Sequence, residues 1–138
     1  MRTAPLLLTL LAGCPPVASG GLGDACQTDA DCNELVCANT HECLTPDQVH
    51  AVRFLWTVRG APADSTSCAG FPTLDLTIED VATAEEATYS PVDCTTGSFA
   101  FPKLPTRYGY VYLVEDSTGA EAEAAIPSAG GDVALDLP

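Results

Sequence analysis

Basic side chains are scarce in this chain. Its 138 residues include 5 Lys and Arg against 19 Asp and Glu, which gives a formal net charge of −14 at pH 7. Binding to a nucleic-acid backbone depends on Lys and Arg that neutralise phosphates, so nucleic acid is not an expected partner. Charged residues still make up only 17% of the chain and hydrophobic residues 46%, unlike the composition of a disordered acidic tail. The composition therefore indicates a folded protein that does not bind nucleic acid.

Residue patterns typical of catalysis are also missing. The chain has two histidines, His41 and His50, and neither accompanies a nucleophile motif such as G-x-S-x-G. Nucleophilic catalysis needs a base beside the nucleophile and a third group that orients the base. The acids are scattered, with no pair that has separable acid and base roles, and no glycine-rich phosphate loop is present. We therefore expect a protein that is not an enzyme, with no catalytic residue and no cofactor.

No apolar run reaches the roughly 18 to 20 residues that a membrane-spanning helix needs. The amino terminus instead has Arg2 followed by a short apolar stretch at residues 4–12, which is the plan of a secretory signal peptide. Leu11-Ala12-Gly13-Cys14 resembles a bacterial lipobox, in which the cysteine is acylated and becomes the first residue after cleavage. The resemblance implies that residues 1–13 are a lipoprotein signal peptide and that Cys14 carries the lipid. Two or more acyl chains give stable membrane anchoring.

The residues after Cys14 bear on the expected location. Pro15 stands where lipoproteins retained in the inner membrane carry Asp. The resemblance therefore implies a protein of the bacterial cell envelope, held by its lipid, with the outer membrane as the expected destination. Residues 15–23 carry no charge and are rich in Pro and Gly. Together with Cys14 they make residues 14–23 an expected flexible tether.

Seven cysteines are many for 138 residues and indicate an oxidising compartment. Without Cys14 six remain, an even number that suits a disulfide framework. The first four have the spacing C-x5-C-x4-C-x5-C and are Cys26, Cys32, Cys37 and Cys43. A segment this short does not bury enough apolar surface to fold unaided, so we expect a disulfide-stapled module at residues 24–48. Sequence alone leaves three pairings of the four cysteines open.

The segment GDACQTDADCNELVCANTHEC resembles the cysteine-rich modules of secreted proteins of the Dickkopf and whey-acidic types. The resemblance rests on the cysteine spacing and on Asp29 and Asp31. It implies an alternating arrangement, in which Cys26 pairs with Cys37 and Cys32 with Cys43.

Two metal-binding interpretations compete with the disulfide interpretation of this segment. Cysteine and His41 are ligand types of tetrahedral zinc, but the C-x2-C pairs of zinc knuckles are absent. Residues 29–33 (D-A-D-C-N) match the first ligand positions of a calcium-binding EF-hand loop, whereas Glu34 occupies the glycine position and Thr40 the position of the final Glu. We therefore expect no metal site and acids that stabilise turns, with calcium binding as the alternative.

From residue 50 onward the hydrophobic pattern changes to a period of two, which is typical of strands. Strands are predicted at residues 52–59, 73–79, 87–94, 98–101, 108–115, 121–126 and 133–137. The third of these contains Pro91, which favours a position at a sheet edge. Seven short strands without a helical stretch predict an antiparallel β-sandwich over residues 50–138, in a chain that is mainly β. Cys68 and Cys94 are expected to form a disulfide within this domain.

Several turn and core positions of this domain resemble the prealbumin-like sandwich modules of the Cna B-type and carboxypeptidase-regulatory kinds, which occur in predicted bacterial surface lipoproteins. These positions are Cys68 before Leu74-Asp-Leu76, then Cys94-x2-Gly97-x-Phe99, Leu104-Pro105 and Asp116-Ser-Thr-Gly119. Such modules are mostly structural or adhesive, so the resemblance implies a non-catalytic role. Some Cna B-type domains form internal isopeptide bonds from a lysine. Lys103, the only lysine, is expected in a turn, and we expect no such bond.

Strand alternation groups the tyrosines of the segment YGYVYLV. Tyr108, Tyr110 and Tyr112 share one face, and Val111 and Leu113 share the other. The aliphatic pair fits between sheets packed about 10 Å apart, which favours outward tyrosines as a candidate platform for a glycan or a partner protein. The alternative is that the tyrosines fill the core.

Together, the lipobox, the cysteine-rich segment and the predicted sandwich indicate a lipid-anchored structural or adhesive envelope protein. The alternative function is that of a glycan- or calcium-binding surface module.

Overall fold

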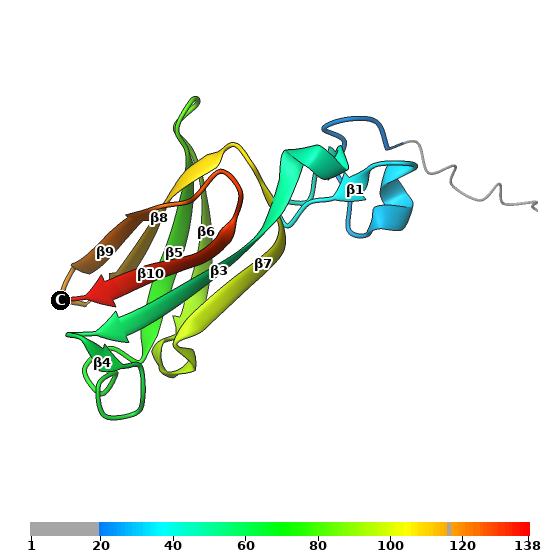
Figure 1. Ribbon diagram of the computed structural model, residues 1–138. Helices are drawn as coiled ribbons and strands as arrows, with labels where there is room; N and C mark the ends of the chain where they lie inside the picture. Colours follow the sequence, from blue (N-terminus) through cyan, green and yellow to red (C-terminus); the bar gives the residue numbers. More distant parts are fainter. Residues whose placement is uncertain (1–19, 116) are drawn as a thin grey trace, which may run out of the picture.

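The computed structural model describes residues 20–115 and 117–138. The expected signal peptide at residues 1–13 and the expected lipid attachment site, Cys14, lie outside the described residues. The described chain is mainly β, with three short 3-10 helices. Figure 1 shows a small cysteine-rich segment at one end of two packed sheets. No helix among the described residues is long and apolar enough to span a bilayer.

Disulfides organise the cysteine-rich segment, residues 24–48. Its elements are η1 (Asp29–Cys32), β1 (Val36–Cys37), β2 (Cys43–Leu44) and η2 (Pro46–Gln48). The disulfides are Cys26–Cys37 and Cys32–Cys43, the alternating pairing that the resemblance implies. All four half-cystines are buried and form a small hydrophobic cluster of their own, with Leu35 packed against it. The two disulfides therefore stabilise this segment, which is too short to have the apolar core of a longer domain.

The last residues of the expected tether lie against this segment. The backbone N–H of Gly23 donates to the carbonyl oxygen of Cys43 at 2.8 Å. The side-chain amide of Asn33 donates to the carbonyl oxygen of Gly20 at 3.3 Å. Residues 20–23 are thus held by the cysteine-rich segment, and the remainder of the expected tether, residues 14–19, lies outside the described residues.

Residues 49–138 form two four-stranded sheets. In the first, β3 (Val49–Val58) pairs with β10 (Gly131–Leu137), β7 (Ser98–Pro105) and the short β4 (Ala61–Pro62). The second has the order β6 (Glu85–Asp93), β5 (Thr73–Asp80), β8 (Tyr108–Glu115) and β9 (Ala120–Ala125). Seven of these strands overlap the segments predicted from alternation, and β4 is an addition. β6, which contains Pro91, lies at the edge of its sheet as its proline suggests.

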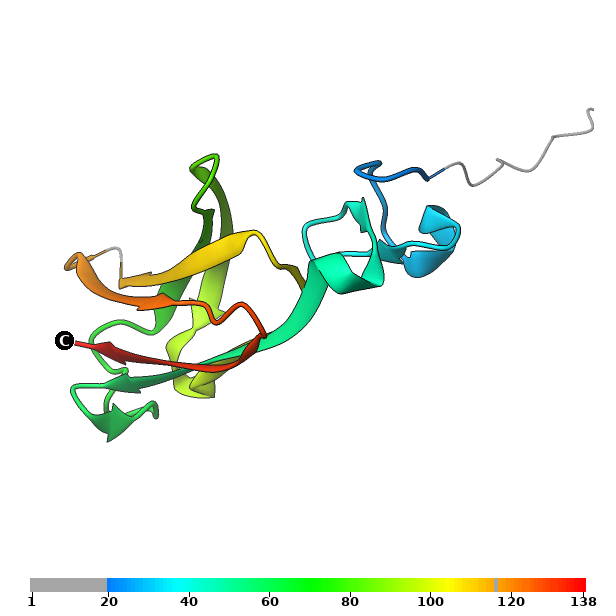
Figure 2. The same cartoon turned by 45° about the horizontal axis from the view of Figure 1, so that its top comes forward.

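One strand pairing departs from the expected antiparallel arrangement. β10 runs parallel to β3, with pairs from Gly131↔Val52 to Leu137↔Val58. Figure 2 shows these two strands, the first and last long strands of the chain, side by side. Alternation of hydrophobic residues tells which side chains of a strand face the core, but it does not tell the direction of the neighbouring strand. The prediction of a purely antiparallel sandwich was therefore wrong for β10.

The two sheets bury one hydrophobic core between their inner faces. Alternate residues of four strands contribute most of it: Val52, Phe54, Trp56, Val58, Leu74, Leu76, Ile78, Val111, Leu113, Val133, Leu135 and Leu137. Phe101 of β7 packs on Phe54 of the same sheet and on Tyr89 of the other, with ring centroids 5.8 and 4.8 Å apart. The expected Cys68–Cys94 disulfide is present and buried in this core. It ties the loop before β5 to η3 (Cys94–Thr96).

β8 follows the expected alternation over most of its length. Val111 and Leu113 are fully buried, whereas Tyr110 and Tyr112 lie on the outer face of the sheet. The aliphatic residues therefore fill the space between the sheets, and these two rings do not.

Tyr108 does not follow this alternation. Its side chain is only 2% exposed, because the register of β8 against β5 shifts by one residue at Gly109. With Gly109 as an extra residue in β8, the side chains before and after it, Tyr108 and Tyr110, lie on opposite faces of the sheet. A Cβ atom at this position would lie against the side chain of Val81, which would have to move. The prediction that three tyrosines point outward is thus wrong for Tyr108, and only Tyr110 and Tyr112 lie on the outer face.

The carboxylate of Glu115 closes the β8–β9 hairpin. It accepts hydrogen bonds from the backbone N–H of Ser117 at 2.8 Å and from the backbone N–H and hydroxyl of Thr118, both at 2.6 Å. These hydrogen bonds lower the pKa of Glu115 to about 2. A buried charge at this position is therefore compatible with the fold because its oxygens are occupied by donors.

The inward and outward side chains of β8 predict different losses of stability when they are truncated to alanine. Leu113→Ala removes a fully buried side chain and should cost about 2 to 5 kcal/mol of unfolding free energy. Tyr110→Ala changes a ring that is 37% exposed and should cost less than about 1 kcal/mol. Urea denaturation of both variants measures this difference. A loss of about 3 kcal/mol or more from Tyr110→Ala would contradict the outward position of the ring.

Candidate functional site

Polar contacts between distant parts of the chain concentrate at the junction, the region where the cysteine-rich segment meets β7 and the start of β8. Lys103 Nζ lies 2.6 Å from Asp29 Oδ1 and Oδ2. The backbone N–H of Lys103 donates to Asn39 Oδ1 at 2.7 Å, and the backbone N–H of Asn39 donates to the carbonyl oxygen of Lys103 at 2.9 Å. Lys103 thus lies in β7, where a turn was expected, and its amine pairs with Asp29.

Arg107, between β7 and β8, makes the second connection across the junction. Its guanidinium lies 2.6 Å from Glu42 Oε1 and 3.5 Å from Asp80 Oδ2, and 5.0 Å from the centre of the Tyr108 ring. The hydrogen bond to Glu42 raises the pKa of Arg107. Burial raises the pKa of Glu42, but hydrogen bonds from Arg107 and Thr40 outweigh burial, so the net pKa is lowered. Both groups therefore stay charged over a wide pH range.

A cleft of about 320 Å³ lies beside these ion pairs, and we call it the junction cleft. Residues 39–41 of the cysteine-rich segment form one wall, Glu85 and Tyr89 of β6 another, and Tyr108 of β8 is also part of the lining. Small-molecule sites favour such boundaries between structural units, and their volumes run from about 300 to 1,000 Å³. Tyrosine hydroxyl groups are neutral at neutral pH, and burial raises the pKa of both tyrosines further.

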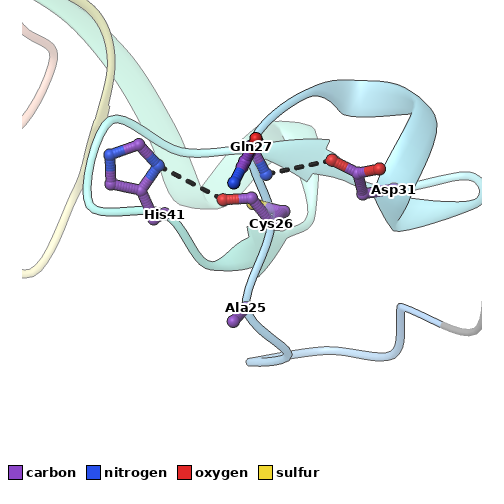
Figure 3. Close-up of a pocket in the computed structure, with 5 residues that line it drawn as sticks. All are labelled: Ala25, Cys26, Gln27, Asp31 and His41. Atoms are coloured by element: carbon purple, nitrogen blue, oxygen red, sulfur yellow. Dashed lines mark hydrogen bonds between the residues drawn. The ribbon is translucent and has the colours of Figure 1, made fainter.

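A second hollow lies against the amino-terminal part of the cysteine-rich segment (Figure 3). Its lining includes Cys26, Gln27, Asp31 and His41. The polar groups of these residues bond to one another: His41 Nδ1 lies 3.2 Å from the carbonyl oxygen of Cys26, and the backbone N–H of Gln27 donates to Asp31 Oδ2 at 3.0 Å. These contacts fix the local backbone, so we interpret this hollow as structural.

The aspartates that were expected to stabilise turns, Asp29 and Asp31, accept hydrogen bonds from backbone N–H groups. Asp31 accepts hydrogen bonds from the backbone N–H groups of Gln27 and Thr28. Asp29 accepts from the backbone N–H of Cys37 at 2.8 Å in addition to the lysine. Hydrogen bonds from Lys103 and from the Cys37 backbone lower the pKa of Asp29. Their oxygens thus stabilise the local fold, as expected of turn acids.

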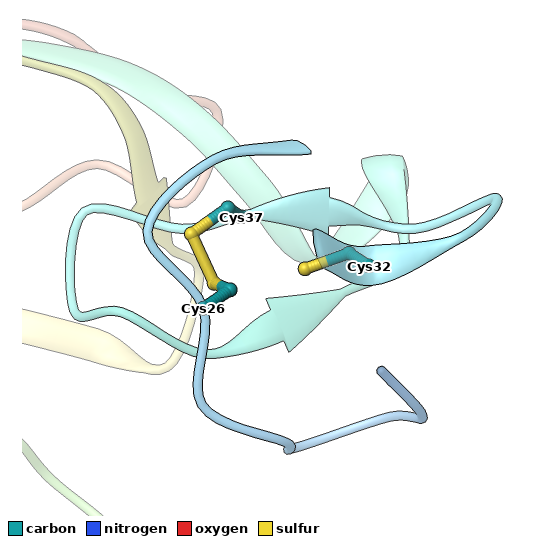
Figure 4. Close-up of side chains that lie close together, drawn as sticks. All are labelled: Cys26, Cys32 and Cys37. Atoms are coloured by element: carbon teal, nitrogen blue, oxygen red, sulfur yellow. A yellow bond between two sulfur atoms is a disulfide. The ribbon is translucent and has the colours of Figure 1, made fainter. Parts of the chain in front are cut away.

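Three cysteine sulfurs of the segment lie within 4.8 Å of one another (Figure 4). They belong to Cys26, Cys32 and Cys37. All three are half-cystines, and a disulfide sulfur lacks the thiolate charge with which cysteine binds zinc. Their proximity is therefore explained by the two crosslinks.

The two outward tyrosines lie on an acidic face of the second sheet. The Tyr112 hydroxyl donates to Glu79 Oε2 at 2.6 Å, and this hydrogen bond raises the pKa of Tyr112 to about 12. Glu123 of β9 is the cross-strand neighbour of Tyr112, and Ala125 that of Tyr110. The expected platform therefore has two of its three members, with carboxylates beside one of them.

Sequence reasoning missed the junction. Lys103 pairs with a residue 74 positions earlier, and Arg107 with one 65 positions earlier, so no local pattern connects these partners. The scarcity of basic residues was the available signal, because each cation in a strongly acidic chain has many potential partners. That signal marks the cations but does not identify the acids they bind.

The degree of burial predicts how strongly two ion pairs couple. Side-chain exposures are 32% and 22% for Arg107–Glu42, and 55% and 54% for Arg53–Asp132. Double-mutant cycles with Gln for Arg or Glu and Asn for Asp, followed by urea denaturation, should give a coupling of about 1 kcal/mol or more for the first pair and less than about 0.5 kcal/mol for the second. Equal couplings would show that Arg107 does not fix the junction.

The function of the junction and of the tyrosine face has to be inferred from this chain's own residues. The chain matches no protein-family model, no curated protein and no solved structure.

Proposed function

We propose that this protein is a lipid-anchored protein of the bacterial envelope, with a structural or adhesive and non-catalytic role. The observation that carries the proposal is the sequence Leu11-Ala12-Gly13-Cys14 behind a short apolar stretch. In this account residues 1–13 are removed and the lipid on Cys14 holds the protein at the membrane. Pro15 in the following position favours the outer membrane.

The disulfides support export. Six of the seven cysteines form three disulfides, and stable disulfides belong to oxidising compartments outside the cytosol. Cys14 is the seventh, so lipid attachment would account for the one cysteine without a disulfide role in the framework.

The described fold supports the structural or adhesive part of the proposal. The two sheets share one core and contain the seven strands expected from the alternation of hydrophobic residues. In our proposal the sandwich and the cysteine-rich module are rigid domains carried by the lipid anchor. A partner protein or a glycan would bind to their surfaces.

A second candidate function, that of a glycan-binding surface module, is favoured by the junction cleft. The cleft combines tyrosine side chains with polar groups, whereas the acids considered for calcium already accept hydrogen bonds from the protein. The geometry therefore favours a glycan over calcium as a ligand.

Fatty-acid labelling tests the lipid anchor. When the full chain is expressed in a bacterial host, the wild type should incorporate labelled palmitate and sediment with the membranes. Cys14→Ala should lose both properties, because it has no thiol to acylate. Pro15→Ala is the matched control and should keep the label. Labelling of Cys14→Ala at the level of the wild type would overturn the proposal.

A further inference from the structure

Tyr108 brings an unpaired hydrogen-bond donor to the junction cleft. The residue is only 2% exposed and is part of the cleft lining. Among the described residues its hydroxyl has a single hydrogen bond, accepted from Arg107 Nη2 at 3.5 Å. The hydroxyl hydrogen thus has no acceptor in the described part of the chain. A polar hydrogen at a binding site is usually matched by an acceptor, and a ligand oxygen in the cleft would supply one.

Tyr89 gives the cleft a fixed aromatic wall. Its ring packs against Phe99 and Phe101, with centroid distances of 5.7 and 4.8 Å, while the residue keeps part of its surface exposed. A ring held in this way loses little conformational freedom when a ligand packs against it. The Tyr89 hydroxyl is protonated at neutral pH and can donate a hydrogen bond, and burial raises its pKa further.

Amide, imidazole and carboxylate groups complete the cleft. Asn39 is positioned by its two hydrogen bonds with Lys103. His41 is held by the contact of Nδ1 with the carbonyl oxygen of Cys26, which leaves Nε2 for a ligand. Glu85 is an exposed acceptor. The nearby cation, Arg107, is already paired with acids.

From these features we infer that the junction cleft binds a neutral, hydroxyl-rich ligand, namely a sugar unit of a glycan. A sugar ring offers an apolar C–H face to Tyr89 and oxygen atoms that accept the Tyr108 hydroxyl hydrogen. An anionic ligand would meet Glu85 without an unpaired cation. The volume of about 320 Å³ is at the small end of ligand sites and suits one ring. The inference rests on the second candidate function, glycan binding, and not on the lipid anchor.

NMR titration of the full, oxidised chain tests the inference. The probes are glucose, galactose, mannose and N-acetylglucosamine, each added up to tens of millimolar. At least one should shift the amide signals of residues 39–41, 85–89 and 108 with a dissociation constant of about 1 mM or tighter. If none of the four shifts these signals, or if the shifts centre on Tyr110 and Tyr112, the inference is overturned.

A conservative variant separates binding from folding. Tyr108→Phe removes only the hydroxyl and should weaken sugar binding about threefold to tenfold. The melting temperature should change little, because this hydroxyl donates to nothing in the described chain and its one contact, with Arg107 Nη2, is long at 3.5 Å. Tyr110→Phe, on the outer face, is the matched control and should bind as the wild type. Unchanged binding by Tyr108→Phe would overturn the inference. Cys14→Ala should bind the same sugars with the same affinity, so a failed lipid anchor and a failed cleft give different results.

Discussion

The contact of Arg107 with Glu42 is the less exposed of the two ion pairs that join the cysteine-rich segment to the sheets in the described chain. The same guanidinium reaches Asp80 at the end of β5 and lies over the Tyr108 ring, so it joins the cysteine-rich segment to both β8 and β5. With a net charge of −14, most carboxylates have no cation to bind, and acids brought together repel one another. Of the four basic residues in the described chain, two, Lys103 and Arg107, form ion pairs across the junction. These pairs connect the cysteine-rich segment to the sheets.

Much of the fold follows from two kinds of sequence pattern. Alternating hydrophobic residues predict the seven long strands, and cysteine number predicts three disulfides. Three features escape these patterns for physical reasons. Alternation does not encode the parallel direction of β10, and it does not reveal the bulge at Gly109 that buries Tyr108. Lys103 lies between Pro102 and Pro105, a composition typical of turns, yet β7 pairs with β3 only, and an edge strand tolerates proline.

The candidate site was less predictable than the fold. The size of the neighbouring residues favoured outward tyrosines, with core tyrosines as the alternative; Tyr110 and Tyr112 lie outward, and Tyr108 is in the core. The junction cleft was not foreseen, because its walls come from the loop at residues 39–41, from β6 and from β8, which only the tertiary structure brings together. The single-residue bulge therefore has two effects: it removes Tyr108 from the outer face, and it makes Tyr108 part of the cleft lining.

The central claim is that the cysteine-rich segment and the two sheets behave as one rigid unit, since the junction cleft needs both walls in place. Backbone ¹⁵N relaxation of the oxidised protein measures this directly. We predict one rotational correlation time for amides of residues 24–48 and of strands β3 to β10. A clearly shorter correlation time for residues 24–48 would show that the segment moves independently, and it would contradict the account of the junction.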